Sequence, residues 1–99
     1  MHLPLENKGQ HKTAMMYLKK ALVIYEQLGG KGNIIALKGT IGDLYSGLGK
    51  FDKSERYLIE SIRLANEIGE DDIQDENLLA DVYLKTGRLD KGYNYLSKL

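Results

Sequence analysis

The chain has 99 residues, with 14 basic and 14 acidic side chains and no cysteine. A chain of this length forms at most one domain, and its 42% hydrophobic and 28% charged residues are typical of a globular protein rather than a disordered one. Because the formal net charge is zero, no global positive field attracts nucleic acid. No apolar run reaches the roughly 18 residues that cross a bilayer. We therefore expect neither nucleic-acid binding nor membrane insertion, and no disulfide or thiolate metal site.

Five helices are predicted in chain order, because apolar side chains recur at three- and four-residue intervals in each. The first covers residues 10–28, and the third repeats its pattern over residues 51–68. The second has apolar positions from Ile34 to Leu48, the fourth from Ile73 to Tyr83, and the fifth begins after Gly87. The predicted core positions of the first helix are His11, Ala14, Tyr17, Leu18, Ala21, Leu22, Tyr25 and Leu28, and those of the third are Phe51, Ser54, Tyr57, Leu58, Ser61, Ile62, Ala65 and Ile68.

Glycines mark the predicted helix ends, where a left-handed residue can close the terminal carbonyls. Asn33 and the acidic residues 70–72 are predicted to cap the starts of the second and fourth helices. Turns of about two residues join the paired helices and force antiparallel neighbours. The glycines in question are Gly29, Gly49, Gly69 and Gly87.

The sequence also repeats itself. An offset of 40 residues places two glycines, Gly29 on Gly69 among them, a tyrosine and a leucine on residues of the same type, and an offset of 38 again aligns a glycine, a tyrosine and a leucine further along. Fixed periods of about 20–50 residues indicate stacked supersecondary units. The matched pairs are Gly9 with Gly49, Tyr17 with Tyr57 and Leu18 with Leu58, then Gly49 with Gly87, Tyr57 with Tyr95 and Leu58 with Leu96.

Small and aromatic residues recur at equivalent places in these units. Gly42, Ser54 and Ala80 are predicted to let neighbouring helices approach closely, because a longer side chain would hold the backbones apart. The tyrosines are predicted to fill the spaces between units as core residues. They are Tyr45 and Tyr83 on the shorter helices, and Tyr17, Tyr57 and Tyr95 on the longer ones.

The order of these residues resembles the tetratricopeptide repeat. The middle unit fits its pattern with Ile41, Gly42, Tyr45, Gly49, Ser54 and Leu58, and the last unit with Leu79, Ala80, Tyr83, Gly87, Gly92 and Leu96. The first unit keeps only Gly9, Ala14 and Leu18. The period of 40 and then 38 residues exceeds the usual spacing of about 34, and Lys38 stands where the family often has Trp. The chain is therefore similar to an extended variant of about forty residues.

The resemblance implies an all-α fold, an α-α superhelix of antiparallel helical hairpins with about five helices. Residues 1–8 are expected to be a lead-in and residues 9–99 a repeat domain, with a partial first unit, a middle unit over 33–69 and a last unit over 72–99. Both ends look unfinished, because Leu96 and Leu99 have no polar cover. Two explanations stay open, a fragment of a longer array or exposed terminal helices that pair with another copy.

The resemblance also implies that the first helix of each pair lines a concave groove. Asp43 and Asp81 occupy equivalent positions there, and two stacked carboxylates favour a basic or hydroxyl-rich peptide. The same charges disfavour the acidic C-terminal peptides that chaperone-binding members of the family hold. Gly39 is expected to leave room for a ligand side chain. The predicted partner-binding residues are Gly39, Asp43, Ser46, Asn77, Asp81 and Leu84.

Catalytic signals are close to absent, so we predict no catalytic residue, no metal site and no cofactor. His11 takes a core position that Phe51 holds one unit later, which favours packing over acid–base chemistry. The acidic run over residues 70–76 lacks the central Gly and terminal Glu of a calcium loop, which favours helix capping. Two segments contain Gly followed by Lys, residues 29–32 and 47–50. Both lack the preceding strand and the following hydroxyl residue of a phosphate-binding loop.

The sequence thus predicts a non-enzymatic scaffold that binds a protein or peptide. The alternative is a sensory segment of a bacterial signalling protein, which binds a small peptide and controls an effector domain outside this chain. A longer parent reading frame with a DNA-binding or kinase domain would distinguish the two. The cytoplasm is the expected compartment.

Overall fold

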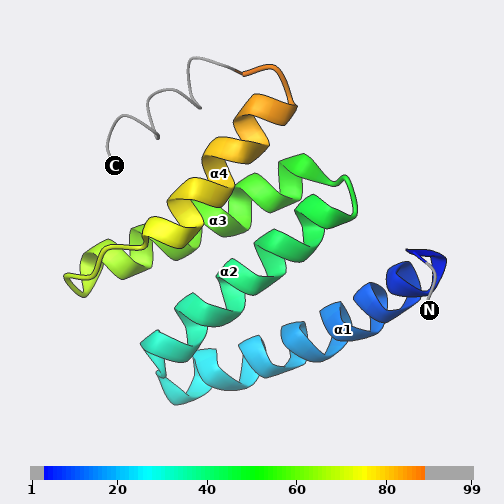
Figure 1. The fold of residues 1–99 in the computed structure, drawn as a ribbon. Helices are drawn as coiled ribbons and strands as arrows, with labels where there is room; N and C mark the ends of the chain where they lie inside the picture. The colour runs from blue at the N-terminus through cyan, green and yellow to red at the C-terminus, as the bar shows by residue number, and fades with distance from the viewer. Residues whose placement is uncertain (1–3, 89–99) are drawn as a thin grey trace.

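A computed structural model describes residues 4–88, and its elements are four α-helices (Figure 1). They are α1 (Pro4–Leu28), α2 (Lys31–Gly47), α3 (Phe51–Glu67) and α4 (Ile73–Lys85). Successive helices run in opposite directions, and residues 4–88 contain no strand, which confirms the predicted all-α hairpin fold. α1 includes residues 4–8 of the expected lead-in. The helix predicted after Gly87 falls on residues 89–99, which lie outside the described residues.

The four predicted glycines end the helices as expected. Their φ angles are +80°, +78°, +78° and +79°, which is the left-handed region that glycine enters without steric cost. At each end, the residue after the glycine donates its N–H to a carbonyl five residues earlier, a Schellman arrangement that closes the last turn. These bonds run from Gly30 to Tyr25 (3.2 Å), Lys50 to Tyr45 (2.9 Å), Glu70 to Ala65 (2.9 Å) and Arg88 to Tyr83 (2.8 Å).

The helix starts were predicted with mixed success. Asp72 caps α4, and its Oδ1 accepts a hydrogen bond of 3.3 Å from the backbone N–H of Asp75. The prediction for Asn33 is wrong, because α2 begins at Lys31 with Gly30 as its N-cap and no side-chain capping bond. The two-residue turn at Gly29 and Gly30 reverses the chain before Asn33 is reached. The turn lengths also vary, with residues 48–50 before α3 and residues 68–72 before α4.

Within residues 4–88, the most extensive helix contact joins α2 and α3. Ser54 Oγ donates a hydrogen bond of 2.7 Å to the carbonyl oxygen of Gly42, and both residues are buried. A Cβ atom on Gly42 would lie 2.8 Å from Cγ of Leu58, which real Cβ contacts do not tolerate. The small residues at Gly42 and Ser54 therefore set this approach, as predicted, and Ala80 on α4 is buried as well.

Apolar side chains form two clusters along the stack. One joins α3 to α4 through Leu58, Ile62, Leu79, Val82 and Tyr83. The other joins α1 to α2 through Met15, Leu22, Ile41 and Tyr45, with Tyr57 of α3 packed against it. No helix within residues 4–88 combines the length and the apolar character that crossing a membrane requires.

The predicted core stripe of α1 is partly wrong. Tyr17 is 62% exposed and Leu28 73% exposed, whereas Met15, which the prediction passed over, is buried. α1 packs mainly against α2, so only the side chains that face α2 are covered. Tyr17 therefore does not fill a space between units among the described residues, while Tyr45, Tyr57 and Tyr83 pack as predicted. Ile68 at the end of α3 is also exposed, and Tyr95 lies outside the described residues.

Candidate functional site

A groove of about 250 Å³ lies between α2 and α4. Three carboxylates line it, and no Lys or Arg among residues 4–88 does. We call it the acidic groove. Among its lining residues are Gly39, Thr40, Asp43, Asp72, Asp75 and Leu78.

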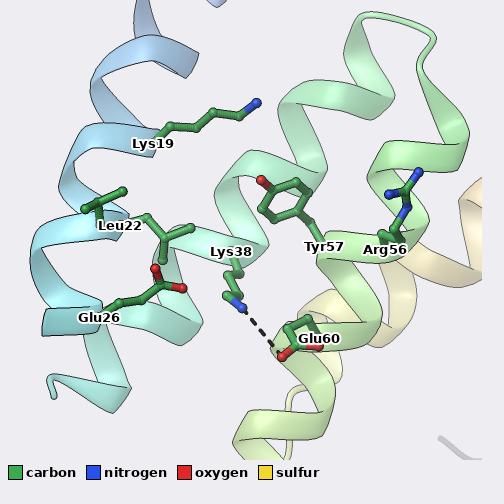
Figure 2. Close-up of a pocket in the computed structure, with 8 residues that line it drawn as sticks. Lys19, Leu22, Glu26, Lys38, Arg56, Tyr57 and Glu60 are labelled. Carbon is green, nitrogen blue, oxygen red and sulfur yellow. Dashed lines mark ion pairs between the residues drawn. The ribbon is translucent and has the colours of Figure 1, made fainter.

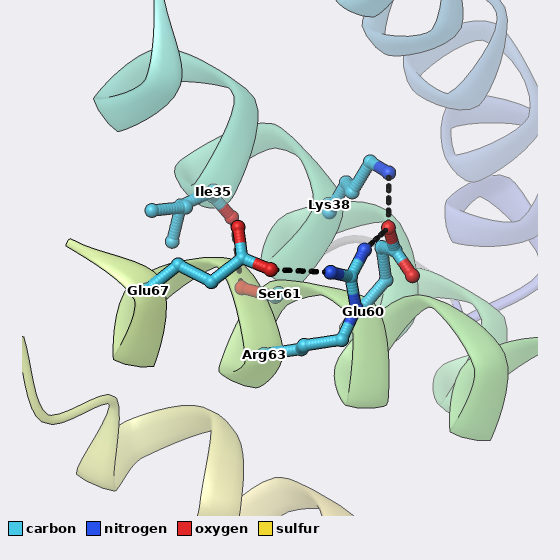
Figure 3. A network of polar contacts seen from close by, with 6 residues as sticks. All are labelled: Ile35, Lys38, Glu60, Ser61, Arg63 and Glu67. Atoms are coloured by element: carbon cyan, nitrogen blue, oxygen red, sulfur yellow. Dashed lines mark hydrogen bonds and ion pairs between the residues drawn. The ribbon is translucent and has the colours of Figure 1, made fainter.

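Asp75 is the centre of this groove's polar contacts. Its side chain is buried, and its Oδ2 atom lies 2.7 Å from Ser61 Oγ on α3. The same hydroxyl lies 3.0 Å from the carbonyl oxygen of Ile35 on α2 (Figure 3). It also lies 3.0 Å from Oδ2 of Asp72. A hydroxyl carries a single proton, so these acceptors share one donor. The cluster ties α2, α3 and the start of α4 together.

Burial raises the pKa of Asp75 to about 6. The hydrogen bond from Ser61 opposes this shift, while the neighbouring carboxylates of Asp72 and Asp43 add to it. The acidic groove therefore holds a carboxyl group that takes up a proton far more readily than an exposed aspartate.

Gly39 contacts this carboxyl group directly. A Cβ atom on Gly39 would lie 2.5 Å from Oδ2 of Asp75. The space that was expected to receive a ligand side chain is thus filled by Asp75, and Gly39 serves the junction between α2 and α4.

The structure brings some of the predicted partner-binding residues together and leaves others apart. Gly39 and Asp43 both line the acidic groove. The remaining four do not: Ser46 lies further along α2 and is half-buried, and the three on α4 are exposed. Asp81 makes an ion pair of 3.0 Å with Lys85 one turn later. The three exposed residues are Asn77, Asp81 and Leu84.

Sequence reasoning missed the role of Asp72 and Asp75, which it assigned to helix capping alone. A signal was present for Asp75, because it precedes Leu79 and Val82 at four- and three-residue intervals and so lies on the core stripe of α4. A carboxylate on such a stripe needs a polar partner. That partner, Ser61, is on another helix and could not be read from local spacing.

A chain of ion pairs covers another part of the α2–α3 contact (Figure 3). Lys38 Nζ lies 3.5 Å from Glu60, and Arg63 bonds both Glu60 and Glu67. The hydrogen bond from Arg63 lowers the pKa of Glu60 despite partial burial. At Lys38, where the family often has Trp, an ion pair with Glu60 therefore connects α2 to α3.

Comparison with known proteins places this unit in a family. The tetratricopeptide-repeat model matches residues 36–68, which begin one turn inside α2 and end just after α3. No curated protein and no solved structure matches the chain. The matched segment is the hairpin whose close contact depends on Gly42 and Ser54, and tetratricopeptide repeats generally act as scaffolds for protein–protein interaction. Residues 36–68 thus match the tetratricopeptide repeat family.

Proposed function

We propose that the chain is a protein-interaction module that binds a basic or hydroxyl-rich peptide segment in the acidic groove. One observation carries the proposal: Asp43, Asp72 and Asp75 line the groove, and none of the ion pairs within residues 4–88 involves them. Like charges at this spacing repel one another, and a cation from a partner would relieve that repulsion. The family's general role in binding proteins supports the same conclusion.

Asp43 is the expected first contact for such a cation. It is exposed, whereas Asp75 is buried behind it and contributes through its field and its hydroxyl partner. Thr40, which also lines the groove, uses its own hydroxyl on the Ala36 carbonyl. A peptide Lys or Arg would therefore bind to Asp43 and a peptide hydroxyl to the neighbouring carboxylate oxygens.

The exposed residues of α4 extend this proposed contact. Among the described residues, Asp81 pairs with Lys85 in an exposed i,i+4 arrangement, worth about 0.3–0.5 kcal/mol. A cation of the peptide can therefore replace Lys85 at little cost. Asn77 and Leu84 would add an amide and an apolar contact on α4, and Ser46 a hydroxyl on α2.

Calorimetric titration with the peptide acetyl-Ser-Lys-Ser-Arg-Ser-Lys-amide tests this proposal. We expect binding to the wild type, and at least a tenfold loss in the variant Asp43→Lys/Asp81→Lys. The control Asp52→Lys/Glu67→Lys carries the same charge change outside the acidic groove and should keep the wild-type affinity. Equal affinity in both variants would remove the acidic groove as the binding site.

A further inference from the structure

A second groove, of about 540 Å³, runs between α1 and α3 (Figure 2). Lys19 and Leu22 line it from α1, and Arg56 and Tyr57 line it from α3. A hollow of about 180 Å³ continues it, shares Lys19, Arg56 and Tyr57, and adds Tyr45 and Lys53. We call the two together the basic groove. Lys38 and Gly39 are consecutive on α2 but line different grooves, so the basic and acidic grooves lie on different faces of that helix.

Three cations, Lys19, Lys53 and Arg56, line one end of the basic groove. Lys19 Nζ donates a hydrogen bond of 2.5 Å to the Tyr45 hydroxyl and lies 5.1 Å from the centre of that ring. Lys53 Nζ lies 5.6 Å from the centre of the same ring. None of the ion pairs among the described residues includes Lys19, Lys53 or Arg56. Two ammonium groups on one tyrosine repel each other, and an anion would offset that repulsion.

Local contacts keep this charge in place. The hydrogen bond to Tyr45 raises the pKa of Lys19, so its amine stays protonated at neutral pH. The Tyr45 ring next to these two amines packs against the Tyr57 ring, with the ring centres 5.7 Å apart. Lys19 and Lys53 are thus both held near the Tyr45 ring, while their side chains stay exposed to a ligand.

The opposite end of the basic groove has a different character. Along α1, Lys19 is followed one turn later by Leu22 and two turns later by Glu26, and all three side chains face the groove (Figure 2). Val23 adds an exposed apolar surface next to Leu22. Lys38 is already paired with Glu60. The groove therefore runs from positive through apolar to negative over about 10 Å, the rise of seven helical residues.

We propose that the basic groove binds an acidic segment of a partner protein, with carboxylates at Lys19, Lys53 and Arg56 and an apolar side chain on Leu22 and Val23. An extended peptide covers about 10 Å in three residues. The segment would therefore present one or two acidic residues, then an apolar residue, then a Lys or Arg opposite Glu26. A continuous phosphate backbone fits less well, because Glu26 and Glu60 line the same groove and repel it.

The test uses the wild-type chain and the probe acetyl-Asp-Glu-Leu-Leu-Lys-amide in calorimetric titration. We expect binding that the variant Lys53→Glu/Arg56→Glu weakens by at least tenfold. The control Lys12→Glu/Lys31→Glu carries the same charge change outside the groove and should stay within twofold of the wild type. The variant Asp43→Lys/Asp81→Lys should also bind normally, which separates this site from the acidic groove.

A reversed probe keeps the test decisive if the charge-reversed variant is destabilised. In the Asp43→Lys/Asp81→Lys background, which removes the acidic groove as a site for basic peptides, acetyl-Lys-Lys-Leu-Leu-Glu-amide should bind the Lys53→Glu/Arg56→Glu variant at least tenfold more tightly than the acidic probe does. Absence of wild-type binding to the acidic probe would overturn the proposal, as would equal loss in the control. Tighter binding of a single-stranded oligonucleotide through the same cations, or dimerisation that the same reversal abolishes, would assign the groove to another occupant and also overturn it.

Discussion

Oδ2 of Asp75 lies 2.5 Å from the position that a Cβ atom would take on Gly39, so α2 and α4 can approach only because residue 39 lacks a side chain. The carboxyl group sits against the α2 backbone and shares the Ser61 hydroxyl with Ile35 and Asp72. This contact joins the α2–α3 hairpin to α4. The geometry of the acidic groove depends on it.

Replacing Gly39 by Ala should therefore destabilise the chain, although Ala is the better helix former. The added methyl group must displace Asp75, and overpacking of this kind costs about 1–3 kcal/mol. Urea denaturation followed by circular dichroism measures the change. Gly32→Ala is the matched control, because Gly32 also lies in α2 and a Cβ there meets nothing within 4 Å. That substitution should be neutral or stabilise by up to about 1 kcal/mol, and an equal loss in both variants would contradict the Gly39 assignment.

The raised pKa of Asp75 predicts a specific pH dependence. Its folded-state pKa of about 6 exceeds the ordinary value of 3.8, so its contribution to stability is complete below pH 3.8 and is lost as the pH rises through 6. Asp75→Asn removes this titration. The unfolding free energy of the Asp75→Asn variant, relative to that of the wild type, should therefore rise by about 2 kcal/mol from acid to neutral pH. This figure includes a discount for solvent screening.

Urea titrations at a series of pH values measure this difference. Comparing the variant with the wild type cancels the opposite effect of Glu60, which both proteins share. The lowered pKa of Glu60 stabilises the fold at pH values above the ordinary pKa of a glutamate, and this stabilisation is lost in acid. Parallel stability curves for the two proteins would show that Asp75 titrates like an exposed aspartate.

The contact between Gly42 and Leu58 predicts an energetic coupling across the α2–α3 hairpin. A Cβ at Gly42 would lie 2.8 Å from Leu58 Cγ, so Gly42→Ala should cost about 1–3 kcal/mol. Leu58→Ala alone should cost about 2–5 kcal/mol, because the side chain is fully buried. In the double variant, the methyl group added at residue 42 occupies part of the cavity that the shortened residue 58 leaves. The loss of stability in the double variant should therefore be smaller than the sum of the losses in the two single variants. Simple additivity in the denaturation data would argue against close packing here.

The helical framework could be predicted from the sequence because its signals are local. Apolar spacing located the four helices, and Gly29, Gly49, Gly69 and Gly87 end them because only glycine enters the left-handed region freely. The close contact at Gly42 followed from residue size. Tyr17 was misplaced because periodicity shows that a helix has an apolar face but does not show which neighbour covers it.

The candidate sites could be predicted only in part, because they depend on side chains from different helices. Asp43 was found through its equivalence to Asp81 one unit later. Asp75 joins the acidic groove only through Ser61 and Gly39, which lie on other helices. The basic groove was missed altogether, since Lys19 and Lys53 are far apart in the chain and meet only at the Tyr45 ring.

The most direct test of the interaction-module account is a chemical-shift map of the ¹⁵N-labelled chain with the peptide acetyl-Ser-Lys-Ser-Arg-Ser-Lys-amide. The account predicts that the largest changes fall on α2 and α4, at Gly39, Asp43 and Asp75, and that they saturate with added peptide. Changes confined to α1 and the outer surface of α3, or no saturable change at any residue, would contradict it.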